Sequence, residues 1–307
     1  MAPAVITVTA VLVVWAIGRA VWHATRANVV LEDLLSGVKW EGFGSIGEKL
    51  ILYFGGIGEH AGYPIFPATV RWLKRIVRRT AGLDGYACLG LAAPGFGGTS
   101  HPDEFEIEEG DVPYETFAKS LVRTLEAAGV KAVRCVGTSL GANLAAAFAA
   151  VAAKESNLIV EKVALIEGLL EPTQPKELKK RFAGNLLKAA RNRLVFKWFS
   201  PRKLFVRLSN RGVLRMSIRE IIPLSRRMDV VRFHQMELAK TVLEKNLFEL
   251  RDRHVPVTAY VVKGSPLSGP VAWAEAHYYS LADVHFFLRE TYLSLTNDPV
   301  IFAQAIV

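Results

Sequence analysis

A serine stands between two glycines in the pentapeptide GTSLG, residues 137–141. An apolar run leads into it and a run of small residues follows it, which is the pattern of a strand, a sharp turn and a helix. On such a turn Ser139 could act as a nucleophile, with the backbone N–H of Leu140 facing a developing oxyanion. The alternative is that Ser139 only caps the helix and that the glycines only form the turn.

The elements that must position this serine alternate along the chain. Strands are predicted at residues 49–56, 86–91, 131–137, 161–168, 255–264 and 277–281, and helices at 29–37, 63–82, 114–129, 140–154 and 297–307. Strands that alternate with helices of this length indicate crossover units and a mostly parallel sheet with helices on both faces. The predicted fold class is therefore α/β.

From about Val38 to its end, the chain resembles the α/β-hydrolase superfamily, in which G-x-S-x-G forms a nucleophile elbow. The glycine-rich segment FGGIGEHAG, residues 54–62, stands where that family has its second oxyanion donor. The resemblance implies that the N–H of Gly56 or Ile57 completes the oxyanion hole with Leu140. It also implies that His60 and Thr138 contact the substrate.

A serine nucleophile needs a base, and the base needs a carboxylate that orients it. The chain has seven histidines: His23, His60, His101, His234, His254, His277 and His285. Only His285, which follows the last predicted strand, matches the family's position for the catalytic histidine. The stretch that carries the acid in most members has none here, so Glu167, at the end of a buried strand, is the predicted acid. Asp283 and Glu275 stay open as alternatives.

The positive charge of the chain is concentrated in one segment. Residues 173–232 hold 17 Lys and Arg and three acidic residues, a formal charge of +14, whereas the rest of the chain carries −5. The family places a helical cap over the active site at this point, and cationic residues mixed with Trp and Phe can lie on an anionic bilayer. The alternative is a solvated helical face that covers the pocket. No nucleic-acid-binding motif accompanies the charge.

The first 18 residues contain no charged side chain, and the apolar run continues to Trp22. About 20 such residues are needed to cross a bilayer, so the pattern predicts a single N-terminal membrane anchor. The basic residues that follow place the catalytic domain in the cytoplasm, and a signal peptide is the alternative. The two cysteines, Cys88 and Cys135, lie in apolar strands and are predicted to be buried free thiols.

These observations predict four segments: an anchor and linker at 1–30, hydrolase core at 31–170, a basic helical cap at 171–253, and the remaining core at 254–307. The predicted function is a membrane-anchored serine esterase, lipase or thioesterase that acts on a lipid-like ester through an acyl-enzyme, without a metal or an organic cofactor. One alternative is a catalytically silent member of the fold that binds a ligand at the membrane. Another is a haloperoxidase-like or acyltransferase-like member.

Overall fold

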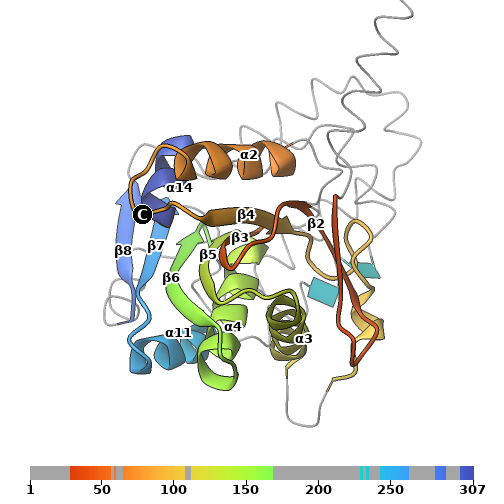
Figure 1. Cartoon of the computed structure of the whole chain (residues 1–307). Helices are drawn as coiled ribbons and strands as arrows, with labels where there is room; N and C mark the ends of the chain where they lie inside the picture. Colours follow the sequence, from red (N-terminus) through yellow and green to blue (C-terminus); the bar gives the residue numbers. More distant parts are fainter. Residues whose placement is uncertain are drawn as a thin grey trace, which may run out of the picture.

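The structure is a computed structural model that describes residues 28–56, 59, 65–107, 112–168, 229–230, 233–234, 243–262, 281–287 and 298–307. The described residues form one eight-stranded sheet with helices on both faces (Figure 1). The predicted α/β class and the mostly parallel sheet are therefore confirmed.

The strands follow the order β1-β2-β4-β3-β5-β6-β7-β8 across the sheet. The first three neighbours, β1, β2 and β4, pair antiparallel, and every pair from β4 to β8 is parallel. The bounds are Val29–Glu32, Lys39–Gly44, Lys49–Phe54, Tyr86–Leu91, Ala132–Thr138, Ile159–Ile166, Val257–Val262 and Asp283–Phe287 for β1 to β8. The carboxyl ends of the parallel strands meet at one edge, where open α/β sheets bind their ligands.

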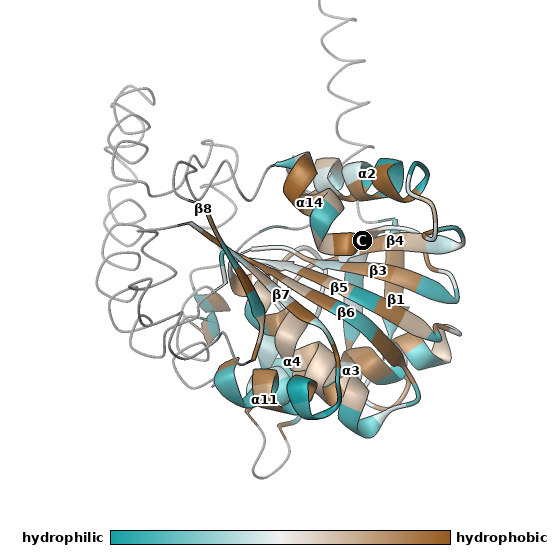
Figure 2. Cartoon of the chain, turned by 90° about the vertical axis from the view of Figure 1, so that its left-hand side faces the viewer, coloured by the Kyte–Doolittle hydropathy of each residue, from teal (hydrophilic) through white to brown (hydrophobic). Residues whose placement is uncertain are grey.

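Two layers of helices bury this sheet (Figures 1 and 2). Helices α2 (Ile65–Val77) and α14 (Pro299–Ile306) cover one face, and α3 (Pro113–Ala127), α4 (Leu140–Glu155) and α11 (Leu243–Asp252) cover the other. A short 3-10 helix, η1 (Pro102–Glu104), lies in the loop after β4. Thirteen of the 16 residues of α4 are buried. The start of α4 is thus held firmly at the carboxyl edge.

The two cysteines lie in the cores on either side of the sheet, as predicted. Cys88 and Cys135 are free and buried. Burial raises the pKa of the Cys88 thiol to about 12 and also raises the pKa of Cys135. Since the thiolate is the reactive form, neither thiol is a nucleophile near neutral pH.

The N-terminal part of the described chain corrects one prediction. Residues 29–37 do not form a linker helix but begin with strand β1, in which exposed and half-buried residues alternate. β1 pairs with β2, a strand that the sequence pattern did not indicate. The backbone groups of β1 that face β2 are paired with it, and a pairing partner distant in sequence is not visible in a four-residue pattern.

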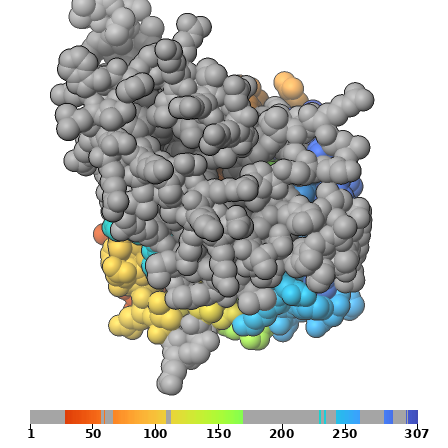
Figure 3. Space-filling view, turned by 180° about the vertical axis from the view of Figure 1, so that it is seen from behind, coloured from red at the N-terminus to blue at the C-terminus, as the bar shows by residue number. Residues whose placement is uncertain are grey.

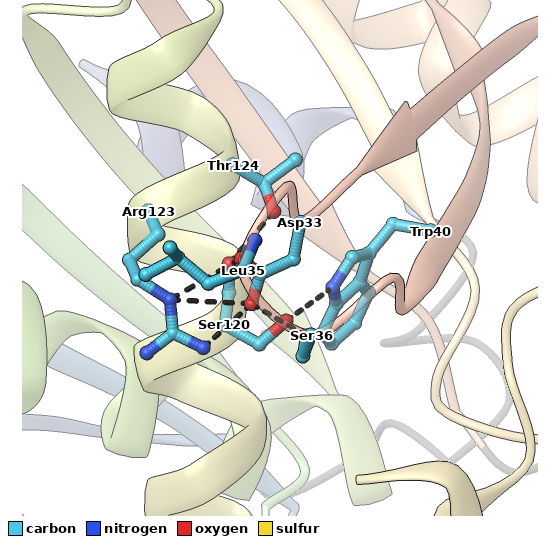
Figure 4. A network of polar contacts seen from close by, with 7 residues as sticks. All are labelled: Asp33, Leu35, Ser36, Trp40, Ser120, Arg123 and Thr124. Atoms are coloured by element: carbon cyan, nitrogen blue, oxygen red, sulfur yellow. Dashed lines mark hydrogen bonds and ion pairs between the residues drawn. The ribbon is translucent and has the colours of Figure 1, made fainter.

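A buried polar network ties the turn after β1 to α3 (Figure 4). Asp33, 1% exposed, accepts a hydrogen bond from Ser36 Oγ at 2.9 Å and pairs with Arg123, whose Nε lies 3.2 Å from Asp33 Oδ2. In the same network, Trp40 Nε1 donates to Ser120 Oγ at 3.3 Å. Burial alone raises the pKa of Asp33, but the hydrogen bonds from Arg123, Ser36 and Ser120 outweigh it and lower that pKa below its ordinary value.

We expect Asp33→Asn to lower the free energy of unfolding by about 2 kcal/mol at pH 7, because it removes the charge that Arg123 pairs with. The folded-state pKa lies below the unfolded value of about 3.9, so the stabilisation is complete above that value and is lost as the pH falls through the folded pKa. Urea unfolding at a series of pH values should therefore show a difference that shrinks below pH ~4. An equal loss at all pH values would contradict the assignment, and Asp84→Asn, in an exposed turn, is the control.

The C-terminal half brings two further results. The predicted last strand at 277–281 lies outside the described residues except for Leu281, and the last strand observed is β8, which contains His285. Most of the predicted cap, including its residues 171–228, also lies outside the described residues. The end of the predicted cap forms α11, which packs against α4 through the core residues Leu243, Leu247 and Leu250. This helix therefore packs into the same core as the sheet.

The predicted membrane localisation is corrected. In the part of the chain that the structure describes, no helix has the length and apolar character needed to span a bilayer. A spanning helix needs about 20 residues, whereas the longest described helix, α4, has 16. The apolar run on which the prediction rested, within residues 1–27, lies outside the described residues.

Candidate active site

Ser139 lies on a strained turn between β5 and α4. Its φ of 54° and ψ of −121° are unusual for a residue with a side chain. Its backbone is fixed on both sides, because its N–H donates to Ile166 O at 2.9 Å and its C=O accepts from Ala142 N–H at 3.0 Å. Within the pentapeptide 137–141, only Ser139 is not buried. The turn thus presents this side chain at the carboxyl edge of the sheet.

The hydroxyl of Ser139 does not cap α4, since its side chain makes no capping hydrogen bond. The alternative reading of the motif as an ordinary helix cap is therefore not supported. A non-glycine residue in such a conformation costs on the order of 1–3 kcal/mol, and strain of this kind concentrates at functional sites.

The two glycines of the motif are required by close backbone contacts. A Cβ placed on Gly137 would lie 2.3 Å from the carbonyl oxygen of Gly141. A Cβ on Gly141 would lie 2.1 Å from the carbonyl oxygen of Phe54, at the end of β3. Both distances are far below van der Waals contact, so the turn forms only with glycine at these two positions.

Two backbone segments could stabilise an oxyanion beside Ser139. Leu140 is the first residue of α4, and the first N–H groups of a helix have no partner within it. A Cβ placed on Gly56 would lie 3.4 Å from Ser139 Cβ, so the loop after β3 runs directly beside the serine. Ile57, the other predicted donor, and His60 lie outside the described residues.

Glu167 ends the strand next to that of Ser139. Thr138 and Ile166 are paired across β5 and β6, so Ser139 and Glu167 follow them as neighbours at the edge. Glu167 is fully buried, has a φ of 51°, and donates its backbone N–H to Tyr260 O at 2.9 Å. Only three non-glycine residues among those described have a positive φ, and two of them, Ser139 and Glu167, are these neighbours at the edge of the sheet. The predicted acid is thus placed beside the predicted nucleophile.

His285 is not brought to Ser139. It lies inside β8 rather than after the last strand, and the pairing row from Thr138 through Tyr260 to His285 crosses three strand spacings, roughly 14 Å. Its ring stacks on Tyr260 with centroids 5.4 Å apart, and its Nε2 lies 2.9 Å from Asp283 Oδ2. His285 and Asp283 are two residues apart on one strand and therefore share a face, where the Asp283 carboxylate is a hydrogen-bond partner of His285.

Thr138, which the sequence predicts to contact the substrate, is buried in the structure. It is 1% exposed, and its Oγ1 lies 3.0 Å from the hydroxyl of Tyr53 on β3. Successive residues of a strand point to opposite faces, and Thr138 points into the core beneath α2 and α14 with Tyr53. The alternative acid Glu275 lies outside the described residues.

Sequence reasoning missed His234, which is fully buried. Its Nε2 lies 2.7 Å from the carbonyl oxygen of Pro94 and its Nδ1 lies 3.1 Å from the hydroxyl of Tyr114. Burial lowers the pKa of His234 to about 4, so the neutral ring donates from Nε2 and accepts at Nδ1. These bonds hold His234 against the loop after β4 and against α3. Figure 3 shows the teal atoms of the described residues near position 230 beside yellow atoms from the first half of the chain. An isolated histidine in a basic segment gives no signal for such a role.

A metal centre finds no support in the part of the chain that is described, which contains no group of three or more His, Cys, Asp or Glu side chains able to hold an ion. Among the described residues at this edge, the groups that could take part in chemistry include the Ser139 hydroxyl, the Glu167 carboxylate and the backbone N–H groups of Leu140 and Gly56.

Comparisons with known proteins agree with this architecture. A family model for the alpha/beta hydrolase fold matches residues 49–206. A carboxylesterase structure from Nitrososphaera gargenis is 14% identical, with 90% of this chain and 95% of that chain covered and a TM-score of 0.56. An esterase from Exiguobacterium antarcticum is 15% identical, with 89% and 96% covered and a TM-score of 0.53. A hydrolase from Pseudomonas aeruginosa PA01 is 15% identical, with 92% and 98% covered and a TM-score of 0.55. None of the curated proteins compared with the chain matches it.

Proposed function

The chain belongs to the α/β-hydrolase fold family, and from this premise we propose that it is a serine hydrolase that cleaves a carboxylic ester or thioester through an acyl-enzyme. The observation that carries the proposal is the strained, uncapped and partly exposed Ser139 beside Gly56. Esterase activity in two of the structurally similar proteins supports the reaction class by analogy only.

In the proposed reaction, Ser139 Oγ adds to the carbonyl carbon of the substrate and its proton passes to a histidine, whose ordinary pKa lies near neutrality. The carbonyl oxygen takes the electron pair of the broken π bond and is stabilised by the N–H groups of Leu140 and Gly56. The intermediate collapses to the acyl-enzyme, and the alcohol or thiol leaves with the proton. Water then adds to the carbonyl carbon of the acyl-enzyme, and the second intermediate collapses to release the carboxylic acid and regenerate Ser139.

Glu167 supplies the carboxylate of this proposal. A fully buried carboxylate is costly unless a hydrogen-bond donor or a cation faces it. Its place at the strand end next to Ser139 suits a group that stabilises the imidazolium formed when the serine loses its proton.

The predicted base His285 gives a prediction of its own. Direct proton transfer needs about 2.6–3.2 Å between heavy atoms, and β8 holds His285 three strands from Ser139. We therefore expect His285→Ala to lower the rate of ester hydrolysis less than threefold. A loss of a hundredfold or more, in protein that stays folded, would show instead that His285 is the base.

The position of His285 also favours one alternative, a catalytically silent binding protein of the same fold. A panel of p-nitrophenyl esters and thioesters, from acetate to palmitate, separates the two functions. Turnover that disappears in Ser139→Ala supports the hydrolase and gives its acyl preference, whereas folded wild-type protein that turns over none of them supports the binding protein.

A further inference from the structure

A chain of hydrogen bonds runs beneath the loop that carries Gly56. Tyr53, near the end of β3 and 1% exposed, donates its hydroxyl proton to Glu59 Oε2 at 2.8 Å. The same hydroxyl oxygen lies 3.0 Å from Oγ1 of Thr138, the residue before Ser139. Since the single phenolic proton goes to the carboxylate, the Thr138 hydroxyl donates to Tyr53. The bonds thus link Glu59 to the residue that precedes the nucleophile.

Glu59 also contacts the glycine loop directly. Its backbone N–H donates to the carbonyl oxygen of Gly56 at 3.0 Å, which closes a turn over residues 56–59. A Cβ placed on Gly55 would lie 2.7 Å from Glu59 Cβ and 2.9 Å from its Oε2, so the side chain packs against the bare backbone of Gly55. The carboxylate of Glu59 therefore lies against Gly55 and Gly56, and Gly56 is the residue that lies beside Ser139.

We propose that Glu59 is a positioning residue for the oxyanion hole: through Tyr53 and Thr138, it sets the distance between the Gly56 backbone and Ser139. This inference rests on the proposed function. The backbone of Glu59 bonds to the loop at Gly56, and its side chain bonds to Tyr53, whose hydroxyl bonds in turn to Thr138 on β5. Glu59 therefore fixes the loop and the proposed nucleophile relative to one another. A misplacement of about 1 Å in such a site can cost on the order of a hundredfold in rate.

The charge of Glu59 is not what the role requires. A negative charge near a developing oxyanion would raise the energy of the transition state, so the carboxylate acts by accepting the Tyr53 hydroxyl. Glutamine retains an oxygen acceptor at the same place, whereas alanine does not. The positioning role therefore predicts that Glu59→Gln is mild and Glu59→Ala severe.

The test compares Glu59→Ala, Glu59→Gln and Tyr53→Phe, with Glu32→Ala, an exposed carboxylate on β1, as the matched control. We expect Glu59→Ala to lower kcat tenfold to a hundredfold with KM changed less than twofold. Glu59→Gln should stay within threefold of wild type. Glu59→Ala combined with Tyr53→Phe should be little worse than Glu59→Ala alone, because both break the same link.

Hydrogen exchange of the peptide that contains Gly55 and Gly56 provides a readout that needs no catalysis. The exchange of this peptide should become at least tenfold faster in Glu59→Ala and stay unchanged in Glu59→Gln. The thermal unfolding temperature should be equal in the wild type and both variants. Unchanged exchange and unchanged kcat in Glu59→Ala would overturn the proposal, as would a Glu59→Gln variant that is as slow as Glu59→Ala. If wild-type protein is inactive, the proposed function fails, and the exchange rates alone then decide whether Glu59 positions the loop.

Discussion

Ser139→Ala is expected to lower kcat for ester hydrolysis by about 10⁴-fold or more, because it removes the atom that forms the acyl-enzyme. The thermal stability of the protein should change little, since the hydroxyl makes no capping bond to α4. Hydrolysis of a p-nitrophenyl ester that the wild type accepts, followed at saturating substrate, measures the effect. The residual activity of the variant measures the contribution of the oxyanion donors and of substrate binding alone.

Ser45→Ala is the matched control for this experiment. Ser45 lies in an exposed loop between β2 and β3, and its backbone N–H, which the substitution retains, donates to Cys88 O at 2.9 Å. It should keep wild-type activity. Hydrolysis by folded Ser139→Ala at more than a tenth of the wild-type rate would mean that another group carries the reaction.

Gly141→Ala is expected to lower the free energy of unfolding by about 3–5 kcal/mol. The new Cβ would lie 2.1 Å from the carbonyl oxygen of Phe54 and 2.4 Å from that of Gly55. Both atoms are backbone at the carboxyl end of β3, so no change of rotamer relieves the contact, and α4 must move away from the sheet. Urea unfolding measures the loss, and labelling of Ser139 should fall with it.

Gly82→Ala separates this clash from backbone strain. Gly82 has a φ of +85° and nothing within 4 Å of a Cβ placed on it, so its substitution reports only the cost of a left-handed residue, about 1–2 kcal/mol. Gly141 is not among the residues with a positive φ. Equal losses from the two substitutions would mean that the elbow tolerates a side chain at position 141.

The sharp turn at Ser139 could be predicted from the sequence because its signals are local. All of these signals lie within about 20 positions: the strand before Ser139, the glycines around it and the small residues after it. The structure shows why the glycines are needed, since a Cβ at either would clash with backbone atoms. The parallel strands were predictable for a similar reason, since strands buried on both faces give continuous apolar runs. Glu167 remains a predicted acid, and its position at the end of a buried strand could be predicted because it ends one such run.

What could not be predicted depends on partners distant in sequence. β1 is a strand because β2 pairs with it, and Thr138 faces inward because Tyr53 receives its hydroxyl across the sheet. Glu59 lies inside the glycine-rich segment 54–62, yet only the folded chain shows its carboxylate bonded to Tyr53 on β3 and, through that hydroxyl, linked to Thr138 on β5. His285 was expected to follow a last strand at 277–281. The last strand observed, β8, begins six residues later at Asp283 and contains His285, so this residue lies within the sheet.

The central claim, that Ser139 is an activated nucleophile, is tested most directly by treating folded wild-type protein with a fluorophosphonate probe and mapping the adduct by peptide mass spectrometry. We predict one adduct, on Ser139, that is absent from Ser139→Ala and retained in Ser45→Ala. Folded protein that takes up no probe, or that carries the adduct on a different residue, would contradict the claim.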